Sequence, residues 1–306
     1  MSALREIAAG SLAAGFTATL FSPLECVKTR LQVQDLPGWP RVYPGGLLAT
    51  LSQIAREDGL LLLWTHGFAG FVGRDLLYSG LRIGLYPTVR ASLTATGADD
   101  ASLPAKIAAG ACTGAIGAAI ANPLDVMRVR MSCEFGVVGA DGVLTTGMRA
   151  GHAPRWRSSL QCLVDCYQRE GVVKGLWRGV SATVARAALL SSGQLASYDH
   201  SKRMLLRSGQ MSDGHRLHAV CAIISGLVAT TVCNPADVMK SALMSAAKDG
   251  AAKPSALAIA RGIVATQGVR GFWRGWTAAY ARAGPAFFIQ MPIVEELRRR
   301  FGVGSL

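Results

Sequence analysis

The chain has 306 residues and a formal net charge of +13; half of its residues are hydrophobic and only 17% are charged. Its mean hydropathy of +0.30 is too apolar for an ordinary soluble domain, so the composition excludes that class and indicates a membrane protein. A nucleic-acid partner is not expected, because the basic residues flank apolar stretches and no nucleic-acid-binding motif is present.

Six stretches of roughly twenty mostly apolar residues are candidate membrane spans, since each is long enough to cross a bilayer core of about 30 Å. In chain order they begin near Arg5, Phe71, Pro104, Gly179, Leu217 and Thr277. Between the two spans of each pair, amphipathic stretches at 47–57, 158–170 and 255–267 predict short helices that lie on the membrane surface.

A charged pattern follows a proline in the first, third and fifth spans. The three copies read Pro23-Leu-Glu25-Cys-Val-Lys28, Pro123-Leu-Asp125-Val-Met-Arg128 and Pro235-Ala-Asp237-Val-Met-Lys240. Acid and base stand three residues apart, so on a helix they share one face just beyond a proline kink. The pattern recurs at intervals of 100 and 112 residues, which indicates one structural unit copied three times. The predicted units are residues 1–100, 101–212 and 213–306.

Two further patterns recur once in each unit. Before the second span of each unit stand Trp64-Thr-His66-Gly67, Trp177-Arg178-Gly179 and Trp273-Arg274-Gly275, the first with one extra residue. Twelve residues after Arg74, Arg186 and Arg282 come Tyr86, Tyr198 and Val294. Those positions lead into Pro87…Arg90, Asp199…Lys202 and Glu295…Arg298.

The three-unit layout and these motifs resemble the mitochondrial carrier family over essentially the whole chain. The resemblance implies an all-α membrane protein: six transmembrane helices as three pseudosymmetric repeats around a central cavity, with short surface helices on the matrix side. It also implies a multi-pass protein of the mitochondrial inner membrane, with both termini toward the intermembrane space. The arginines of the segment expected to face the matrix, Arg149, Arg155 and Arg157, agree with a positive-inside bias.

The resemblance further implies two gates of charged side chains. The expected matrix gate consists of Glu25, Lys28, Asp125, Arg128, Asp237 and Lys240, with Gln32 at the family's bracing position. The expected cytoplasmic gate consists of Tyr86, Arg90, Tyr198, Asp199, Lys202, Glu295 and Arg298. Pro87 stands where the first unit should supply an acid, so the cytoplasmic gate has fewer acids than bases.

The family's substrate-contact positions correspond to Arg74-Asp75, Arg186-Ala187 and Arg282. Three arginines that converge on one site require an anion, because a guanidinium group stays charged and pairs bidentately with carboxylate or phosphate. We expect Arg82, Gln194 and Gln290, which lie eight residues further along, to line the same cavity. An adenine pocket is not expected, because nucleotide carriers show a Gly-aliphatic pair at the Arg186-Ala187 position.

The fourth span resembles dicarboxylate carriers, whereas Leu81-Arg82-Ile-Gly-Leu-Tyr86 resembles uncoupling proteins. We predict an exchanger of small anions by alternating access, with dicarboxylates such as malate, succinate or 2-oxoglutarate exchanged for phosphate or another dicarboxylate. An uncoupling-protein-like proton or anion carrier and an acidic amino-acid carrier stay open as alternatives. The second alternative depends on Asp75, which either neutralises Arg74 or accepts the amine of an amino acid.

The resemblance also implies that cardiolipin binds where helix starts present backbone N–H groups, at Arg178, Gly179, Arg274 and Gly275. We expect the protein to be a monomer that binds no cofactor and no metal. Cys162 and Cys166 stand four residues apart, but no second ligand pair accompanies them. No catalytic constellation is present, so an enzyme is not expected.

Overall fold

The computed structural model describes residues 2–36, 39–59, 61–65, 67–95, 103–134, 136–209, 214–246 and 254–301. Its long helices are α1 (Ser2–Val33), α4 (Phe68–Ala95), α5 (Leu103–Glu134), α7 (Val180–Arg207), α8 (His215–Ser245) and α10 (Trp276–Arg300). Each begins within three residues of a predicted span. The prediction of an all-α fold with six long helices in three pairs is therefore confirmed.

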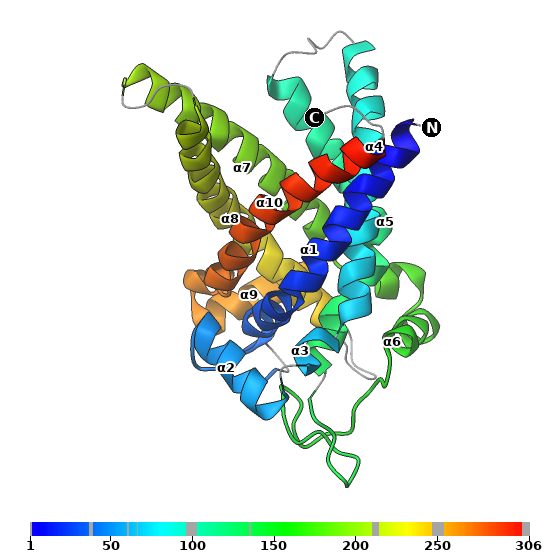
Figure 1. Cartoon of the computed structure of the whole chain (residues 1–306). Coiled ribbons are helices and arrows are strands. Elements are labelled where there is room, and N and C mark those ends of the chain that lie inside the picture. The colour runs from blue at the N-terminus through cyan, green and yellow to red at the C-terminus, as the bar shows by residue number, and fades with distance from the viewer. Residues whose placement is uncertain are drawn as a thin grey trace.

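The long helices form a closed ring. Neighbours in space follow the order α1, α4, α5, α7, α8 and α10, and α10 packs back against α1. In Figure 1 the helices converge toward the lower end of the molecule and spread apart above it, with the start of α1 and the end of α10 at the upper end. The ring thus brings the three repeats together around a common axis.

Short helices cover the lower end of the ring. They are α2 (Leu47–Glu57), α3 (Leu62–Thr65), α6 (Ser159–Asp165), η1 (Cys166–Glu170), η2 (Val172–Leu176), α9 (Ala256–Gln267) and η3 (Val269–Trp273). The predicted helices at 47–57 and 255–267 agree with α2 and α9, whereas the predicted helix at 158–170 continues from α6 into the π-helical η1. The hydroxyl oxygens of Ser158 and Ser255 cap α6 and α9 by accepting hydrogen bonds from backbone N–H groups.

The apolar core lies below the prolines. α1, α5 and α8 each continue through their proline, and the segments beyond it pack together with α2, α6 and α9. Core members from these elements include Val27, Val126, Val238, Ile54 and Ile263, all nearly inaccessible to solvent. This core fixes the height at which the charged groups beside the prolines meet.

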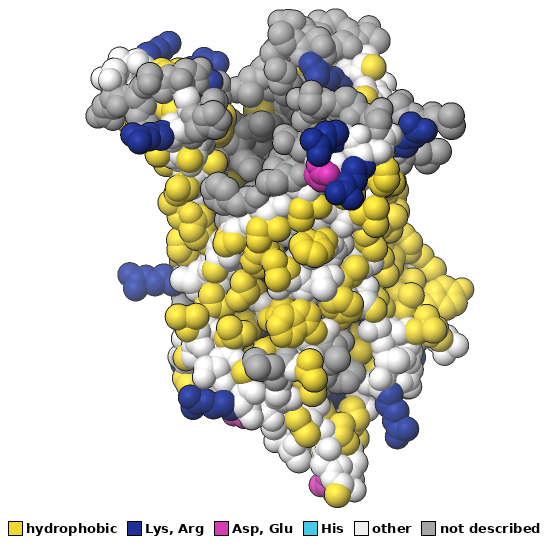
Figure 2. All heavy atoms as spheres, in the orientation of Figure 1, with side chains coloured by type: hydrophobic (Ala, Val, Ile, Leu, Met, Phe, Trp, Pro, Cys, Tyr) yellow, Lys and Arg dark blue, Asp and Glu magenta, His cyan; other side chains and the backbone are white. Residues whose placement is uncertain are grey.

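On the face shown in Figure 2, the outer surface carries a broad hydrophobic band across its middle, and most Lys and Arg side chains lie toward the two ends. Exposed apolar side chains at helical spacing include Leu12, Phe16, Leu20, Ile116, Ile120, Val228 and Val232. Among the described helices, three are long and apolar enough to span a membrane by themselves: Ile7–Val33, Ile107–Glu134 and Ala219–Ser245. α7 and α10 are comparably long but more polar, and α4 carries the charged residues Arg74, Asp75, Arg82 and Arg90 within an otherwise apolar helix.

A glycine with positive φ precedes each of α4, α7 and α10. Gly67, Gly179 and Gly275 have φ angles of 74°, 75° and 70°, in the region that side chains with a Cβ avoid. A Cβ on Gly275 would lie 3.0 Å from Cγ of Gln32, on α1, and one on Gly67 would lie 3.0 Å from the Arg128 carbonyl, on α5. These glycines let α4, α7 and α10, which are the second, fourth and sixth spans and are called the even-numbered spans below, start close against the next repeat.

Candidate functional site

Six charged side chains meet at the level of the prolines. We call them the kink network: Glu25, Lys28, Asp125, Arg128, Asp237 and Lys240. The structure brings all six together in three ion pairs between helices: Lys28 with Asp237 (Nζ–Oδ2, 2.7 Å), Lys240 with Asp125 (Nζ–Oδ2, 2.8 Å) and Arg128 with Glu25. The helices α1, α5 and α8 are the first, third and fifth spans, called the odd-numbered spans below. Each base pairs with the acid of another of these three helices, so the pairs link α1, α8 and α5 in a closed triangle.

The kink network is buried. Each of its side chains is 10% exposed or less. Two weaker contacts join acid and base within one helix, Lys28 with Glu25 at 3.8 Å and Arg128 with Asp125 at 3.1 Å. Removing one member of a buried ion pair leaves an uncompensated charge, which costs roughly 3–5 kcal/mol. The network therefore holds the three helices together just beyond their prolines.

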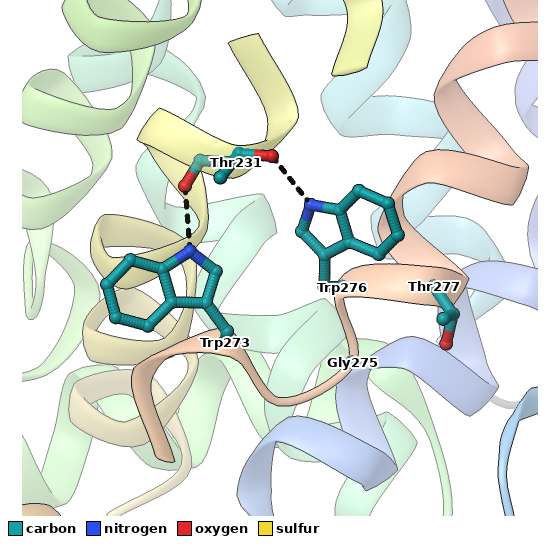
Figure 3. A pocket seen from close by; sticks show the side chains of 5 residues that line it. All are labelled: Thr231, Trp273, Gly275, Trp276 and Thr277. Carbon is teal, nitrogen blue, oxygen red and sulfur yellow. Dashed lines mark hydrogen bonds between the residues drawn. The ribbon is translucent and has the colours of Figure 1, made fainter. Parts of the chain in front are cut away.

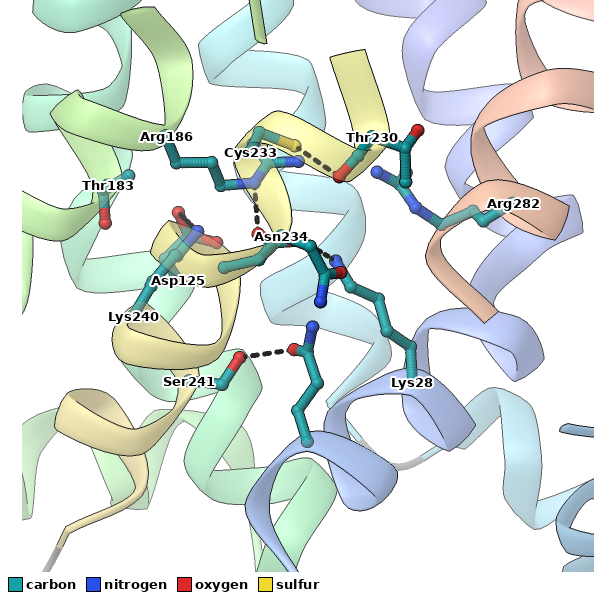
Figure 4. Close-up of polar contacts among 12 residues, drawn as sticks. Lys28, Asp125, Thr183, Arg186, Thr230, Cys233, Asn234, Lys240, Ser241 and Arg282 are labelled. Carbon is teal, nitrogen blue, oxygen red and sulfur yellow. Dashed lines mark hydrogen bonds and ion pairs between the residues drawn. The ribbon is translucent and has the colours of Figure 1, made fainter. Parts of the chain in front are cut away.

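Three arginines from the other helices reach the same carboxylates. We call Arg74, Arg186 and Arg282 the arginine layer. Nε of Arg74 lies 3.4 Å from Oδ1 of Asp125, Arg186 donates to Asp237, and Nε of Arg282 lies 2.8 Å from Oε2 of Glu25. In Figure 4, Arg186 and Arg282 point toward the centre from α7 and α10. The three predicted contact arginines thus do converge, but onto the carboxylates of the kink network.

Each kink-network carboxylate is consequently shared between a base on an odd-numbered span and an arginine on an even-numbered one. Asp237, for example, contacts both Lys28 and Arg186. The sequence predicts three arginines that are available to an anion. It does not show that their guanidinium groups already contact carboxylates of the protein. An anion that binds these arginines competes with Glu25, Asp125 and Asp237.

Arg74 has two additional partners. Its Nη1 donates a hydrogen bond to Oδ1 of Asp75, and its guanidinium carbon lies 4.3 Å from the ring centroid of Tyr78, a cation–π contact. The sequence analysis did not single out Tyr78. Its spacing of four residues from Arg74 on one helix is the signal that identifies it.

The remaining predicted cavity residues lie further along their helices. Arg82 and Gln194 stand eight residues beyond Arg74 and Arg186, or about 12 Å along a helix axis. The side chain of Gln290 is outside the described part of the chain. Gln32 accepts a hydrogen bond from the hydroxyl of Ser241 at 2.8 Å, which joins α1 to α8 one turn below Lys28.

The predicted cytoplasmic gate is described only in part, because the side chains of Asp199, Glu295 and Arg298, three of its seven residues, lie outside the described part of the chain. Tyr86, Arg90, Tyr198 and Lys202 lie in the upper parts of α4 and α7, far along these helices from the arginine layer. This gate stays a prediction.

Two buried arginines that the sequence analysis did not assign tie the helix ends to the surface helices. Arg30 pairs with Asp58 at 3.2 Å, and Arg130 pairs bidentately with Glu170 at 2.7 Å for both contacts. The signal is present in the motifs, since each arginine stands two residues after the base of its proline pattern. The third repeat has Ala242 at the equivalent position.

Two asparagines hold the turns before α7 and α10. The amide nitrogens of Asn122 and Asn234 donate to the carbonyls of Leu176 and Phe272, at 2.8 and 2.9 Å. The sequence signal for them is an Asn directly before the proline in two of the three repeats. They connect the proline kinks to the Trp-Arg-Gly turns.

A surface pocket of about 530 Å³ lies at the start of α10 and is lined by Thr231, Trp273, Gly275, Trp276 and Thr277. Figure 3 shows both indoles directed at Thr231, and the two indole hydrogen bonds to its carbonyl and hydroxyl measure 3.1 Å each. Gly275, a predicted lipid residue, therefore borders a pocket at a helix start.

The predicted lipid-binding arginines point elsewhere. Arg274 pairs with Asp35 at 2.7 Å and donates to the carbonyl of Gln34 at 3.0 Å. Arg178 donates to the carbonyls of Leu243 and Pro254. Both side chains join their own repeat to a neighbouring chain segment, and only the glycines Gly179 and Gly275 mark the helix starts themselves.

Comparison with known proteins agrees with this geometry. A family model described as mitochondrial carrier protein matches residues 1–96, 99–209 and 214–304, and each segment contains one proline pattern. The chain is 33% identical to the mitochondrial 2-oxoglutarate/malate carrier protein of Bos taurus, over 94% of the chain and 88% of the relative. It is 32% identical to mitochondrial uncoupling protein 5 of Arabidopsis thaliana, over 97% and 98%. It is also 32% identical to mitochondrial citrate transporter F of Aspergillus niger, over 95% and 88%.

Proposed function

The chain belongs to the mitochondrial carrier family, and on that premise we propose that it exchanges dicarboxylates such as malate, succinate or 2-oxoglutarate for phosphate or another dicarboxylate. Members of this family are multi-pass transporters of the mitochondrial inner membrane, so we expect no enzymatic activity. The similarity to 2-oxoglutarate/malate carriers supports the substrate class.

The observation behind this proposal is the arginine layer directly above the closed kink network. Arg186 and Arg282 come from different helices, and each contacts a network carboxylate. A dicarboxylate that engages these guanidinium groups draws them away from Asp237 and Glu25. Substrate binding then breaks the contacts by which these two arginines join neighbouring repeats, and its binding energy offsets part of the cost of opening the bundle.

The ion pairs also support an assignment of the carrier's state. In the family's orientation the kink network corresponds to the matrix gate, and its three interhelical pairs are formed. This supports a state that is closed toward the matrix and faces the intermembrane space. We propose this as the resting state of the carrier.

Reconstitution tests the proposal. Purified protein in liposomes loaded with malate or phosphate should take up labelled malate, and empty liposomes should take up little. Arg282→Ala should lower exchange about tenfold or more, since a charged hydrogen bond contributes roughly 1.5–3 kcal/mol. Near-normal exchange by a folded Arg282→Ala carrier would contradict the assignment of the anion site.

An uncoupling-protein-like proton carrier is the second candidate, favoured by 30% identity to mitochondrial uncoupling protein 3 of Arabidopsis thaliana over 98% of the chain. The same liposomes distinguish the two. An uncoupler shows fatty-acid-stimulated proton flux without any need for an internal anion, whereas an exchanger requires the internal anion.

We also propose cardiolipin as a lipid partner. The pocket at the start of α10 supports this, because a helix start offers backbone N–H groups to phosphate and the two indoles suit the membrane interface. Native mass spectrometry should show retention of cardiolipin over a neutral lipid, and Gly275→Ala should reduce it. Equal retention of both lipids would contradict this assignment.

A further inference from the structure

The charges of the arginine layer, the kink network and Asp75 do not balance. Ion pairs connect all of these side chains into one cluster. Its bases are Lys28, Arg74, Arg128, Arg186, Lys240 and Arg282, and its carboxylates are Glu25, Asp75, Asp125 and Asp237. Six bases face four acids, and every one of these side chains is at most 21% exposed. Because excess charge deep in a membrane protein is costly, this cluster with two surplus positive charges favours an anion with two negative charges.

The surplus is not spread evenly. The kink network balances itself, with three bases and three acids. Arg74 has a carboxylate of its own, because Asp75 is its neighbour on α4 and accepts its hydrogen bond. Arg74 also contacts Asp125 and the Tyr78 ring, so its guanidinium group is surrounded by partners.

Within the described residues, Arg186 and Arg282 have no carboxylate partner that is theirs alone. Arg186 shares Asp237 with Lys28, and Arg282 shares Glu25 with Arg128. The Arg282 contact is also poorly aligned, since neither its Nε nor Oε2 of Glu25 has a hydrogen-bond partner within the described structure. At 21% exposed, Arg282 is the most accessible of the three arginines.

We infer that Asp75 sets the charge of the transported anion at two: it neutralises Arg74, so that Arg186 and Arg282 hold the two carboxylates of the substrate. This inference rests on the proposed function of small-anion exchange. It assigns to Asp75 selection against trivalent anions, because a third carboxylate finds Arg74 already occupied.

The same geometry bears on the amino-acid alternative. A substrate amine that binds Asp75 must displace the guanidinium group of Arg74, which donates directly to that carboxylate. Displacement leaves Asp125 as the one carboxylate that contacts Arg74 among the described residues, and Asp125 is already shared with Arg128 and Lys240. The described contacts therefore favour a neutralising role for Asp75 over amine recognition.

Uptake measured with reconstituted carrier tests the inference. Labelled malate and labelled citrate are compared at a pH where malate is divalent and citrate trivalent. Asp75→Asn frees Arg74 and adds one positive charge, and it should raise the ratio of citrate to malate uptake about tenfold or more, the effect expected for one unscreened charge contact. Asp75→Glu keeps the charge and should leave the ratio near that of the unmodified carrier.

The double variant Arg74→Gln with Asp75→Asn is the decisive control. It removes both charges of the pair and restores the surplus of two, so its citrate-to-malate ratio should return toward that of the unmodified carrier even if its rates fall. A role of Asp75 that does not act through Arg74 predicts instead that the double variant keeps the ratio of Asp75→Asn. Thermal unfolding of each variant in detergent shows that it is folded.

Three outcomes would overturn the inference. The first is malate exchange by Asp75→Asn with an unchanged citrate-to-malate ratio, which leaves the proposed function intact. The second is a double variant that keeps the ratio of the single one. The third is amino-acid uptake that is present in the unmodified carrier and lost in Asp75→Asn. If the unmodified protein exchanges neither malate nor citrate, the proposed function itself fails, which is a separate result.

Discussion

The second and third repeats fasten their surface helices to the ring by different means. In the second, the buried Arg130 binds Glu170 bidentately and donates through Nε to the carbonyl of Met244 in the next repeat. In the third, Ala242 replaces the arginine and Gln267 replaces the acid. Gln267 instead donates to the carbonyl of Asp35, at 3.2 Å.

Burial separates the two arrangements. Arg130 and Glu170 are 1% and 12% exposed, whereas Arg274 and Asp35, the ion pair that joins the third repeat to the first, are 21% and 25% exposed. A fully buried pair is costly to break on one side, whereas a more exposed pair contributes less. The comparison shows that pseudosymmetry of the fold does not require equal interactions: both members of the buried pair are absent together, and a lone buried charge is avoided.

The largest expected effect comes from breaking the buried pair on one side. Arg130→Ala leaves Glu170 without its main cation and should lower the free energy of unfolding by roughly 3–5 kcal/mol. Thermal unfolding in detergent measures the loss. Arg130→Ala with Glu170→Gln, which copies the third repeat, should recover most of it. If the single and double variants unfold at the same temperature, the Glu170 carboxylate that has lost Arg130 is not the cause.

A smaller effect is expected from the glycines before α7 and α10. Gly275→Ala and Gly179→Ala place an alanine at nearly equal positive φ, which alone costs about 1–2 kcal/mol. The added Cβ lies 3.0 Å from Cγ of Gln32 in the first case and 3.4 Å from its nearest neighbours in the second. Gly275→Ala should therefore be the more destabilising of the two in the same thermal assay. The reverse order would mean that the contact between the third and first repeats is the looser one.

The smallest effect is expected for the more exposed ion pair, Arg274 with Asp35. Arg274→Gln removes the contact with Asp35 and should lower the free energy of unfolding by about 1 kcal/mol or less. Salt screens partly exposed charges more than buried ones, so the difference from the unmodified carrier should shrink at high ionic strength. The loss in Arg130→Ala should persist there. A salt-insensitive Arg274→Gln effect would indicate that its hydrogen bond to the Gln34 carbonyl matters more.

The sequence predicts the architecture well, because the proline pattern repeats with its charges in register. Each repeat places an acid and a base on one helix face beyond its proline. Three such helices arranged in a ring let each base pair with the acid of another helix, and the interhelical pair of Lys28 with Asp237 agrees with this arrangement. The starts of the long helices follow from the positions at which the apolar stretches begin.

The partners of the arginines are less predictable. Arg178 and Arg274 stand in a motif that suggests a lipid phosphate, yet their side chains reach carbonyls and a carboxylate of neighbouring segments. Sequence spacing gives the position of such a side chain but not the rotamer that selects its partner. For the same reason, the contacts of Arg186 and Arg282 with network carboxylates emerge only from the packed helices.

With the kink network as the proposed matrix gate, the triangle of ion pairs at the prolines makes opening cooperative. α1 contributes Glu25 to one pair and Lys28 to another, and α5 and α8 contribute in the same way. Outward displacement of any one of these three helices therefore breaks two of the three interhelical pairs at once. With the proposed gate role, partial opening already has most of the electrostatic cost of full opening, so the arrangement disfavours half-open states through which small ions would leak across the membrane.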